Sequence, residues 1–203
     1  MRLTDNRYAA ERLQFELALR MIRHEARTRT IKACTGLSDD RIRKLYTTYF
    51  GDGDSSGVRR RRGKSPRQVS LFVRNPLNQL EATTLVALFC ASLLLRIDAA
   101  KRIQPCWPRP DVEYGHRLCR AYETYLLLHP SPRITFEWAW NLLQTISHND
   151  ELYLADCHEC HAAYVQDSYA IDHKRCPSCE IANHRVRRPG GRIFARNPGV
   201  RTT

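Results

Sequence analysis

Apolar residues recur at helical spacing along most of the chain. This pattern covers residues 5–27, 30–50, 114–128 and 135–148. Apolar side chains three and four residues apart fall on one face of an α-helix, so each segment is predicted to be helical. Residues 5–27 are apolar on more than one face, which predicts a helix packed against two partners.

The longest apolar run, from Leu85 to Leu95, is interrupted only by Ser92. A membrane-spanning helix needs about 20 apolar residues, so the run predicts a buried helix over 77–96 and no membrane association. The proline-rich stretch 105–110 is predicted to be an extended connection. The expected fold class is therefore mainly α.

Residues 30–50 divide at Thr35-Gly36 into a short helix and a second helix. Ser38 is the expected N-cap of the second helix, and the two Asp residues after it favour the helix dipole. A glycine turn between two helices is typical of a helix-turn-helix. The expected buried positions are Ile31, Leu37, Ile42 and Leu45.

The second helix of this segment would leave Arg41, Arg43 and Lys44 exposed as candidate DNA contacts. The fit to a helix-turn-helix is incomplete. Lys32 stands where the first helix usually has a small residue, and Thr35 where it usually has an apolar one. Acidic residues at the front of the second helix would also repel phosphate.

The net charge of +12 is concentrated in two regions. Residues 27–67 carry twelve Lys and Arg against four Asp, whereas residues 181–203 carry six Arg and no acidic residue. Localised basic regions are typical of proteins that bind a polyanion, most often nucleic acid. A solvated charged surface is the other interpretation.

Further candidate DNA contacts lie in these two regions. Residues 51–68 read as a flexible linker because they are rich in Gly, Ser, Asp and Pro. The candidates are Arg59, Arg60, Arg61, Arg62 and Lys64 in the linker, and Arg185, Arg187 and Arg188 near the C-terminus.

Four of the eight cysteines form two Cys-x2-Cys pairs separated by fifteen residues. The pairs are Cys157/Cys160 and Cys176/Cys179. This spacing is typical of a structural Zn²⁺ site with four thiolate ligands. Disulfides are the alternative, but the N-terminal residues have no apolar segment that suggests export, so a reduced, cytoplasmic location is expected.

Three histidines lie in or beside the same segment, namely His158, His161 and His173. One of them replacing a cysteine as ligand is an open alternative, although solvated loop histidines are the simpler interpretation. We expect one Zn²⁺ per chain. The predicted domains are a helical domain over 1–150 and a zinc-ribbon-like module with a basic tail over 151–203.

Several spaced motifs together resemble FlhC, the partner of FlhD in the bacterial flagellar transcriptional activator. In chain order they are LSDDRIRKLY (37–46), GKSP (63–66), ALFC (87–90), AYETYL (121–126), the Ala139-Trp140 pair, and the cysteine quartet followed by a basic tail. The resemblance covers most of the chain.

The resemblance to FlhC implies a helical DNA-binding activator subunit with one structural zinc held by the four cysteines. It also implies a heterohexamer of four FlhD and two FlhC chains, which binds and bends promoters of flagellar class II genes and recruits RNA polymerase. The arginine run at 59–62 is denser than the family pattern, which leaves open either extra nonspecific DNA affinity or a changed set of target genes.

Two other classes of function were weighed against this one. A zinc-ribbon RNA-binding or ribosome-associated protein would share the charge and the cysteines, but it would not explain the long apolar helices. An enzyme is not indicated, because the sequence has no Gly-rich phosphate loop, HExxH motif, nucleophile elbow or plausible carboxylate pair. No catalytic residue is therefore assigned.

Overall fold

The computed structural model describes residues 2–51, 57–61, 63, 68–148, 151–170 and 175–186, apart from the side chains of 2–6 and 184–186. Over these residues the fold is mainly α, as predicted, with two small antiparallel hairpins. The elements are α1 (Arg2–Arg23), α2 (Thr28–Thr35), α3 (Asp39–Phe50), α4 (Ser70–Val73), α5 (Pro76–Ala91), β1 (Leu95–Ile97), β2 (Ile103–Pro105), α6 (Val112–Leu128), α7 (Phe136–His148), β3 (Leu152–Asp156), β4 (Ala163–Asp167) and α8 (Pro177–Val186).

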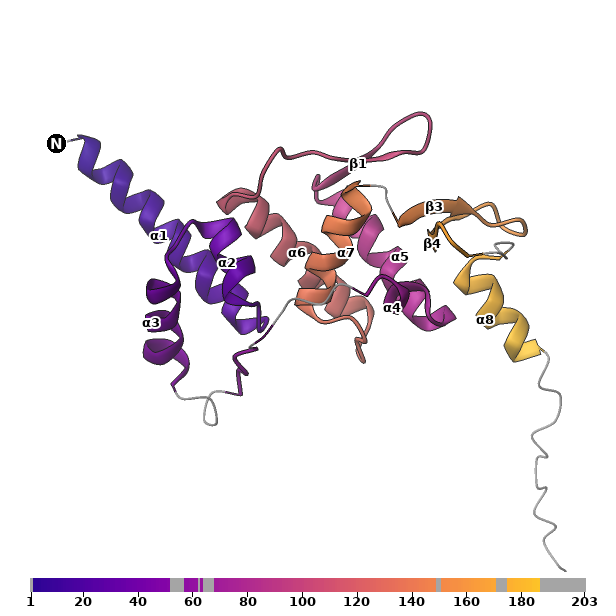
Figure 1. The fold of residues 1–203 in the computed structure, drawn as a ribbon, viewed down its shortest axis with the longest axis horizontal. Coiled ribbons are helices and arrows are strands. Elements are labelled where there is room, and N and C mark those ends of the chain that lie inside the picture. Colours follow the sequence, from indigo (N-terminus) through magenta and orange to yellow (C-terminus); the bar gives the residue numbers. More distant parts are fainter. Residues whose placement is uncertain are drawn as a thin grey trace, which may run out of the picture.

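Figure 1 shows these elements arranged in three regions along the molecule. Helices α1, α2 and α3 form one end, α5, α6 and α7 the middle, and the β3–β4 hairpin with α8 the opposite end. A single hydrophobic core runs from Leu17 on α1 to Val165 on β4. No described helix combines the length and apolar character needed to cross a bilayer.

The predicted boundaries of the second and third helices are confirmed. Gly36 ends α2 in the left-handed conformation, with φ of 71°, and its N–H donates to the carbonyl of Lys32. Ser38 is the N-cap of α3, and its hydroxyl accepts a hydrogen bond from the backbone N–H of Arg41 at 3.4 Å. The side chains of Asn75 and Asp111 cap α5 and α6 in the same way.

The prediction of one helix over 77–96 is wrong at its C-terminal end. Helix α5 ends at Ala91, and Leu93 then adopts a left-handed φ of 56°. The N–H of Leu94 donates to Phe89, and that of Leu93 to Cys90, which is the Schellman pattern that ends a helix. The chain then forms β1, which pairs with β2 in an antiparallel hairpin that the sequence analysis did not predict.

The first predicted helix also ends early, at Arg23 rather than residue 27. The stretch 105–110, predicted to be an extended connection, begins with the last residue of β2. The short helix α4 was not predicted. The tryptophans of α7 are half-buried against the core, as expected from their helical spacing. The four cysteines without ligand spacing, Cys34, Cys90, Cys106 and Cys119, would by default be buried small apolar residues, but Cys106 is exposed.

Helices α1, α2 and α6 meet at Gly115, where there is no room for a side chain. A Cβ atom on Gly115 would lie 2.5 Å from Leu17 Cδ2 on α1 and 3.0 Å from Cys34 Cβ on α2. The missing side chain therefore allows α6 to approach both helices. This contact joins the α1–α3 end of the molecule to the central helices.

We expect Gly115→Ala to destabilise the protein, because the added methyl group overpacks this contact. Overpacking of a core typically costs about 1–3 kcal/mol, more than the gain in helix propensity of roughly 1 kcal/mol. The measurement is chemical denaturation of the variant, of Leu17→Ala, and of the double variant. Shortening Leu17 makes room for the methyl group, so the double variant should lose less stability than the two single losses added together.

Candidate metal centre and basic surface

The four predicted ligands come from two structural elements that meet at the end of the molecule. Cys157 directly follows β3, and Cys160 lies in the turn that leads to β4. Cys176 directly precedes α8, and Cys179 lies in its first turn. A β-hairpin turn and a helix N-terminus thus each contribute one Cys-x2-Cys pair.

The four sulfur atoms all lie within 4.8 Å of one another. The Sγ atoms of Cys157 and Cys179 are 3.8 Å apart, and those of Cys160 and Cys176 are 3.6 Å apart. A tetrahedral Zn²⁺ site with Zn–S bonds of about 2.3 Å has sulfurs about 3.8 Å apart. A disulfide would bring two sulfurs to about 2.05 Å, so the arrangement suits a metal ion and not a pair of disulfides.

Backbone N–H groups point at the sulfurs from within the cluster. The N–H of Cys176 donates to Cys157 Sγ at 3.2 Å, and the N–H of Cys179 donates to Cys176 Sγ at 3.4 Å. Hydrogen bonds of this kind favour the thiolate form. The pKa of Cys157 is lowered to about 6, chiefly by the backbone N–H of Cys160.

The pKa of Cys179 shifts in the opposite direction from that of Cys157, because the groups hydrogen-bonded to Cys179 are themselves thiols. Hydrogen bonding with the side chains of Cys160 and Cys176 raises the pKa of the Cys179 thiol. Four thiolates this close together repel one another unless a cation compensates their charge. The cluster therefore favours a divalent cation that takes sulfur ligands, and a shell of four thiolates is typical of a structural site.

Packing and polar contacts hold the two cysteine pairs together. Cys157 and Cys176 are buried and form a small separate core with Tyr164. Glu159, in the turn between β3 and β4, forms an ion pair with Arg175 at 2.7 Å and accepts a hydrogen bond from Asn183 Nδ2 at 3.4 Å. The hairpin turn is therefore linked to both sides of Cys176.

The alternative histidine ligands do not join the cluster in the described residues. His158 and His161 are exposed, and the only ligand group in the described part of the chain consists of the four cysteines. His161 adopts a left-handed φ of 58°, which closes the turn after Cys160. His173 lies outside the described residues.

The metal module is fixed to the central helices by hydrogen bonds between side chain and backbone. Gln79 Nε2 on α5 donates to the carbonyl of Val165 at 2.9 Å, and the N–H of Val165 donates to Thr83 Oγ1 at 3.1 Å. Strand β4 is thus attached along one face of α5. The predicted boundary near residue 150 separates the metal ligands from the helices, but the hydrophobic core continues across it.

The three candidate DNA contacts of the second helix are all exposed on α3. Arg41 forms an ion pair with Glu11 of α1 at 2.8 Å and lies over the ring of Phe15. Arg43 pairs with Asp40 at 3.1 Å within α3. Lys44 forms no ion pair within the described residues, so it is the least compensated of the three.

The arginine run of the predicted linker is described only at 59–61. Arg61 forms an ion pair with Glu25 at 2.7 Å, and the guanidinium of Arg60 lies over the ring of Tyr46 at 5.3 Å. The expectation of a flexible linker is wrong for this part, because these contacts attach it to the helical domain. Arg62, Lys64, Arg187 and Arg188 lie outside the described residues, as does the side chain of Arg185.

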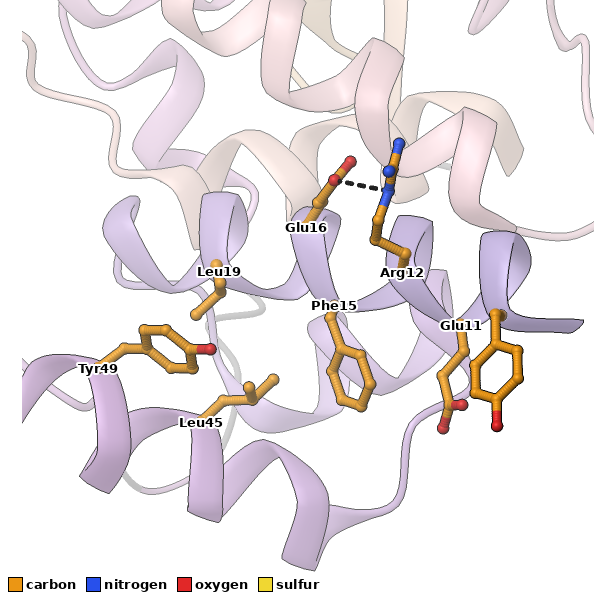
Figure 2. A pocket seen from close by; sticks show the side chains of 8 residues that line it. Glu11, Arg12, Phe15, Glu16, Leu19, Leu45 and Tyr49 are labelled. Carbon is orange, nitrogen blue, oxygen red and sulfur yellow. Dashed lines mark ion pairs between the residues drawn. The ribbon is translucent and has the colours of Figure 1, made fainter. Parts of the chain in front are cut away.

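A groove of about 480 Å³ between α1 and α3 was not predicted (Figure 2). Its apolar wall is formed by Phe15 and Leu19 on α1 and by Leu45 and Tyr49 on α3. The two residues of each pair are four positions apart, about one helical turn, and this apolar spacing is visible in the sequence. The spacing does not reveal which face stays exposed, because that depends on how the two helices cross.

A scan against models of known protein families matches none of them, and a search of curated proteins finds no match. The resemblance to FlhC therefore stays a hypothesis based on the motifs in the sequence.

We expect the purified protein to contain about one zinc ion per chain, and Cys157→Ser or Cys179→Ser to lose it. Metal binding contributes to folding in such modules, so both variants should also unfold more easily. Zinc content by elemental analysis and thermal unfolding are the measurements. Cys106→Ser, at an exposed cysteine outside the cluster, is the matched control. Full zinc occupancy in Cys160→Ser and Cys176→Ser would instead indicate histidine ligands.

Proposed function

We propose that the protein is a DNA-binding regulatory subunit of the FlhC type. It binds promoter DNA together with an FlhD-type protein, as a hetero-oligomer of four FlhD and two FlhC chains, and recruits RNA polymerase. Flagellar class II genes are the expected targets. One structural zinc ion per chain, held by the four cysteines, stabilises the C-terminal module.

The observation that carries the proposal is the α2–turn–α3 unit. Only residues 36–38 connect the two helices, and a turn of three or four residues containing glycine is characteristic of helix-turn-helix units. The positions predicted to hold the helices together are all buried, namely Ile31, Leu37, Ile42 and Leu45. The opposite face of α3 is polar and exposed, as expected for a recognition helix.

The two departures from the motif have local explanations. Thr35 is buried, but its hydroxyl donates to the carbonyl of Ile31 at 2.8 Å and accepts from the N–H of Leu37 at 3.2 Å. A polar residue is therefore satisfied at a position that is usually apolar. Lys32 is exposed and pairs with Asp39 at 3.0 Å, so it does not separate the helices.

Ion pairs also reduce the repulsion that the acidic start of α3 would exert on phosphate. Asp39 is paired with Lys32, and Asp40 with Arg43. Each pair leaves the surface locally neutral, whereas Lys44 remains positive. Together with Arg59 and Arg60, which form no ion pair within the described residues, Lys44 gives the α1–α3 end of the molecule positive charge suited to phosphate.

The groove between α1 and α3 supports the proposed partner. Two large aromatic side chains that line it are exposed: Tyr8 is 67% exposed and Tyr49 61%. Exposed apolar surface rimmed by polar residues is typical of a protein interface. An FlhD-type chain that covers this groove would leave the polar face of α3 free for DNA.

We expect Arg43→Ala/Lys44→Ala to reduce the preference for a specific site by roughly tenfold or more, because a good contact to a base edge contributes about 1–3 kcal/mol of discrimination. Binding of the FlhD-bound complex is measured on its preferred duplex, selected from a randomised pool, and on a random duplex. Arg96→Ala/Arg102→Ala, on the β1–β2 hairpin, removes the same charge and is the control.

The salt dependence of binding to the same two duplexes separates contacts to phosphate from contacts to bases. Replacing Arg59, Arg60, Arg61 and Arg62 by Ala should weaken binding to both duplexes alike. The plot of log K against log salt should lose about 0.9 of slope for each phosphate contact removed. Tighter binding of structured RNA than of any duplex would favour the RNA-binding alternative and contradict the proposal.

We expect the protein to aggregate when produced alone and to be monodisperse when co-produced with an FlhD-type protein, because the partner covers the exposed apolar groove. The measurement is size-exclusion chromatography with light scattering. Tyr49→Gln, at an exposed residue of the groove, should prevent complex formation, whereas Leu127→Gln, at an exposed leucine of α6 outside the groove, should not. A stable monomer that ignores the partner would contradict the prediction.

A further inference from the structure

The connection between α1 and α2 holds Glu25 in an unusual backbone conformation. Glu25 has φ of 57°, in the left-handed region. Its N–H donates to the carbonyl of Ile22, and the N–H of Ala26 to that of Met21, which is a Schellman motif. Glycine is the usual residue at this position because a side chain is strained there. The backbone alone does not account for a glutamate.

The carboxylate of Glu25 instead contacts the linker segment 57–61. Oε2 accepts from Arg61 Nε at 2.8 Å, and Oε1 accepts from the backbone N–H of Arg59 at 3.4 Å. Beside it, Arg27 Nη1 donates to the carbonyl of Gly63 at 2.7 Å. Glu25 and Arg27, both in the connection between α1 and α2, therefore make three hydrogen bonds to Arg59, Arg61 and Gly63.

A second set of contacts attaches the segment to α3. The guanidinium of Arg60 lies over the ring of Tyr46, and the Tyr46 hydroxyl donates to the carbonyl of Ala26 at 2.9 Å. Val58 packs against the hydrophobic core. The segment thus rests on both the α1–α2 connection and helix α3, and its position is linked to theirs.

This position places the arginines next to the exposed face of α3. Arg43 and Tyr46 are three residues apart on α3, so they are neighbours on its surface. Arg60, which covers Tyr46, therefore lies on the same side of α3 as Arg43. Basic residues far apart in the sequence are brought to one surface.

We infer that Glu25 is a positioning residue: it docks residues 57–61 on the α1–α2 connection and on α3, so that Arg59 and Arg60 form one preformed phosphate-contacting surface with Arg43. This inference rests on the proposed DNA-binding function. A docked segment has already lost its conformational freedom, so it binds phosphate without the ordering cost that a flexible linker incurs.

The sign of the charge effect makes the inference testable. Removing the negative charge of Glu25 raises the net charge by one unit, which by electrostatics alone strengthens DNA binding. Loss of docking should instead weaken DNA binding. Glu25→Gln removes the ion pair, and Glu25→Gly also removes the side chain and the backbone strain. Glu113→Gln, at a glutamate paired with Arg117 on α6, makes the same charge change away from the segment and the groove.

The first measurement is hydrogen exchange over residues 57–61 in the full-length chain without DNA. Both Glu25 variants should lose protection at these amides, Glu25→Gly the more strongly, whereas Glu113→Gln should not. The melting temperature of Glu25→Gly should be unchanged or higher, because glycine suits the left-handed position. Unchanged protection in Glu25→Gly would overturn the docking role.

The second measurement is duplex affinity against salt concentration. We expect Glu25→Gly to bind about tenfold more weakly at an unchanged salt slope, since the arginines still reach phosphate but must be ordered first. Affinity equal to or higher than that of Glu113→Gln would overturn the inference while leaving the proposed function intact. A wild-type chain that binds no duplex, with or without its FlhD-type partner, would overturn both.

Discussion

The close approach of three helices at Gly115 is the constraint on which the rest of the structure depends. Helix α6 can contact both Leu17 of α1 and Cys34 of α2 only because residue 115 has no Cβ. This contact fixes α2, and α2 carries the Gly36 turn that directs α3. The exposed polar face of α3 therefore depends on the absence of one methyl group in the centre of the fold.

The short connection between α1 and α2 links the packed core to the surface. His24 stacks on Phe136 and contacts Glu123, while the N–H of Arg27 donates to the buried carboxylate of Glu137 at 2.6 Å. Each of these contacts faces the central helices. Glu25 lies between them, and its left-handed backbone turns its carboxylate toward the arginine segment instead. One connection thus orders both the core and the basic surface.

The parts of the fold that local signals determine could be predicted from the sequence. Helical spacing identified most of the helices, Ser38 and Gly36 marked the boundary of α2 and α3, and the cysteine spacing identified the four-cysteine cluster that could hold a metal ion. The end of α5 could not be predicted, because Leu93 adopts a conformation usually taken by glycine, inside an apolar run. The docking of residues 57–61 also escaped prediction, because it depends on contacts with Glu25 and Tyr46, far away in the sequence.

The central helices join the two regions of proposed function. The metal cluster is attached to α5 through the bonds of Gln79 and Thr83 to Val165, and the α1–α3 end is attached to α6 at Gly115. Helices α5 and α6 pack against each other in the same core. The distance between α3 and the metal module is therefore set by packed helices rather than by a flexible linker. A duplex that contacts both ends of the molecule must match that fixed distance, so the helical core would contribute to the choice and shape of the bound DNA.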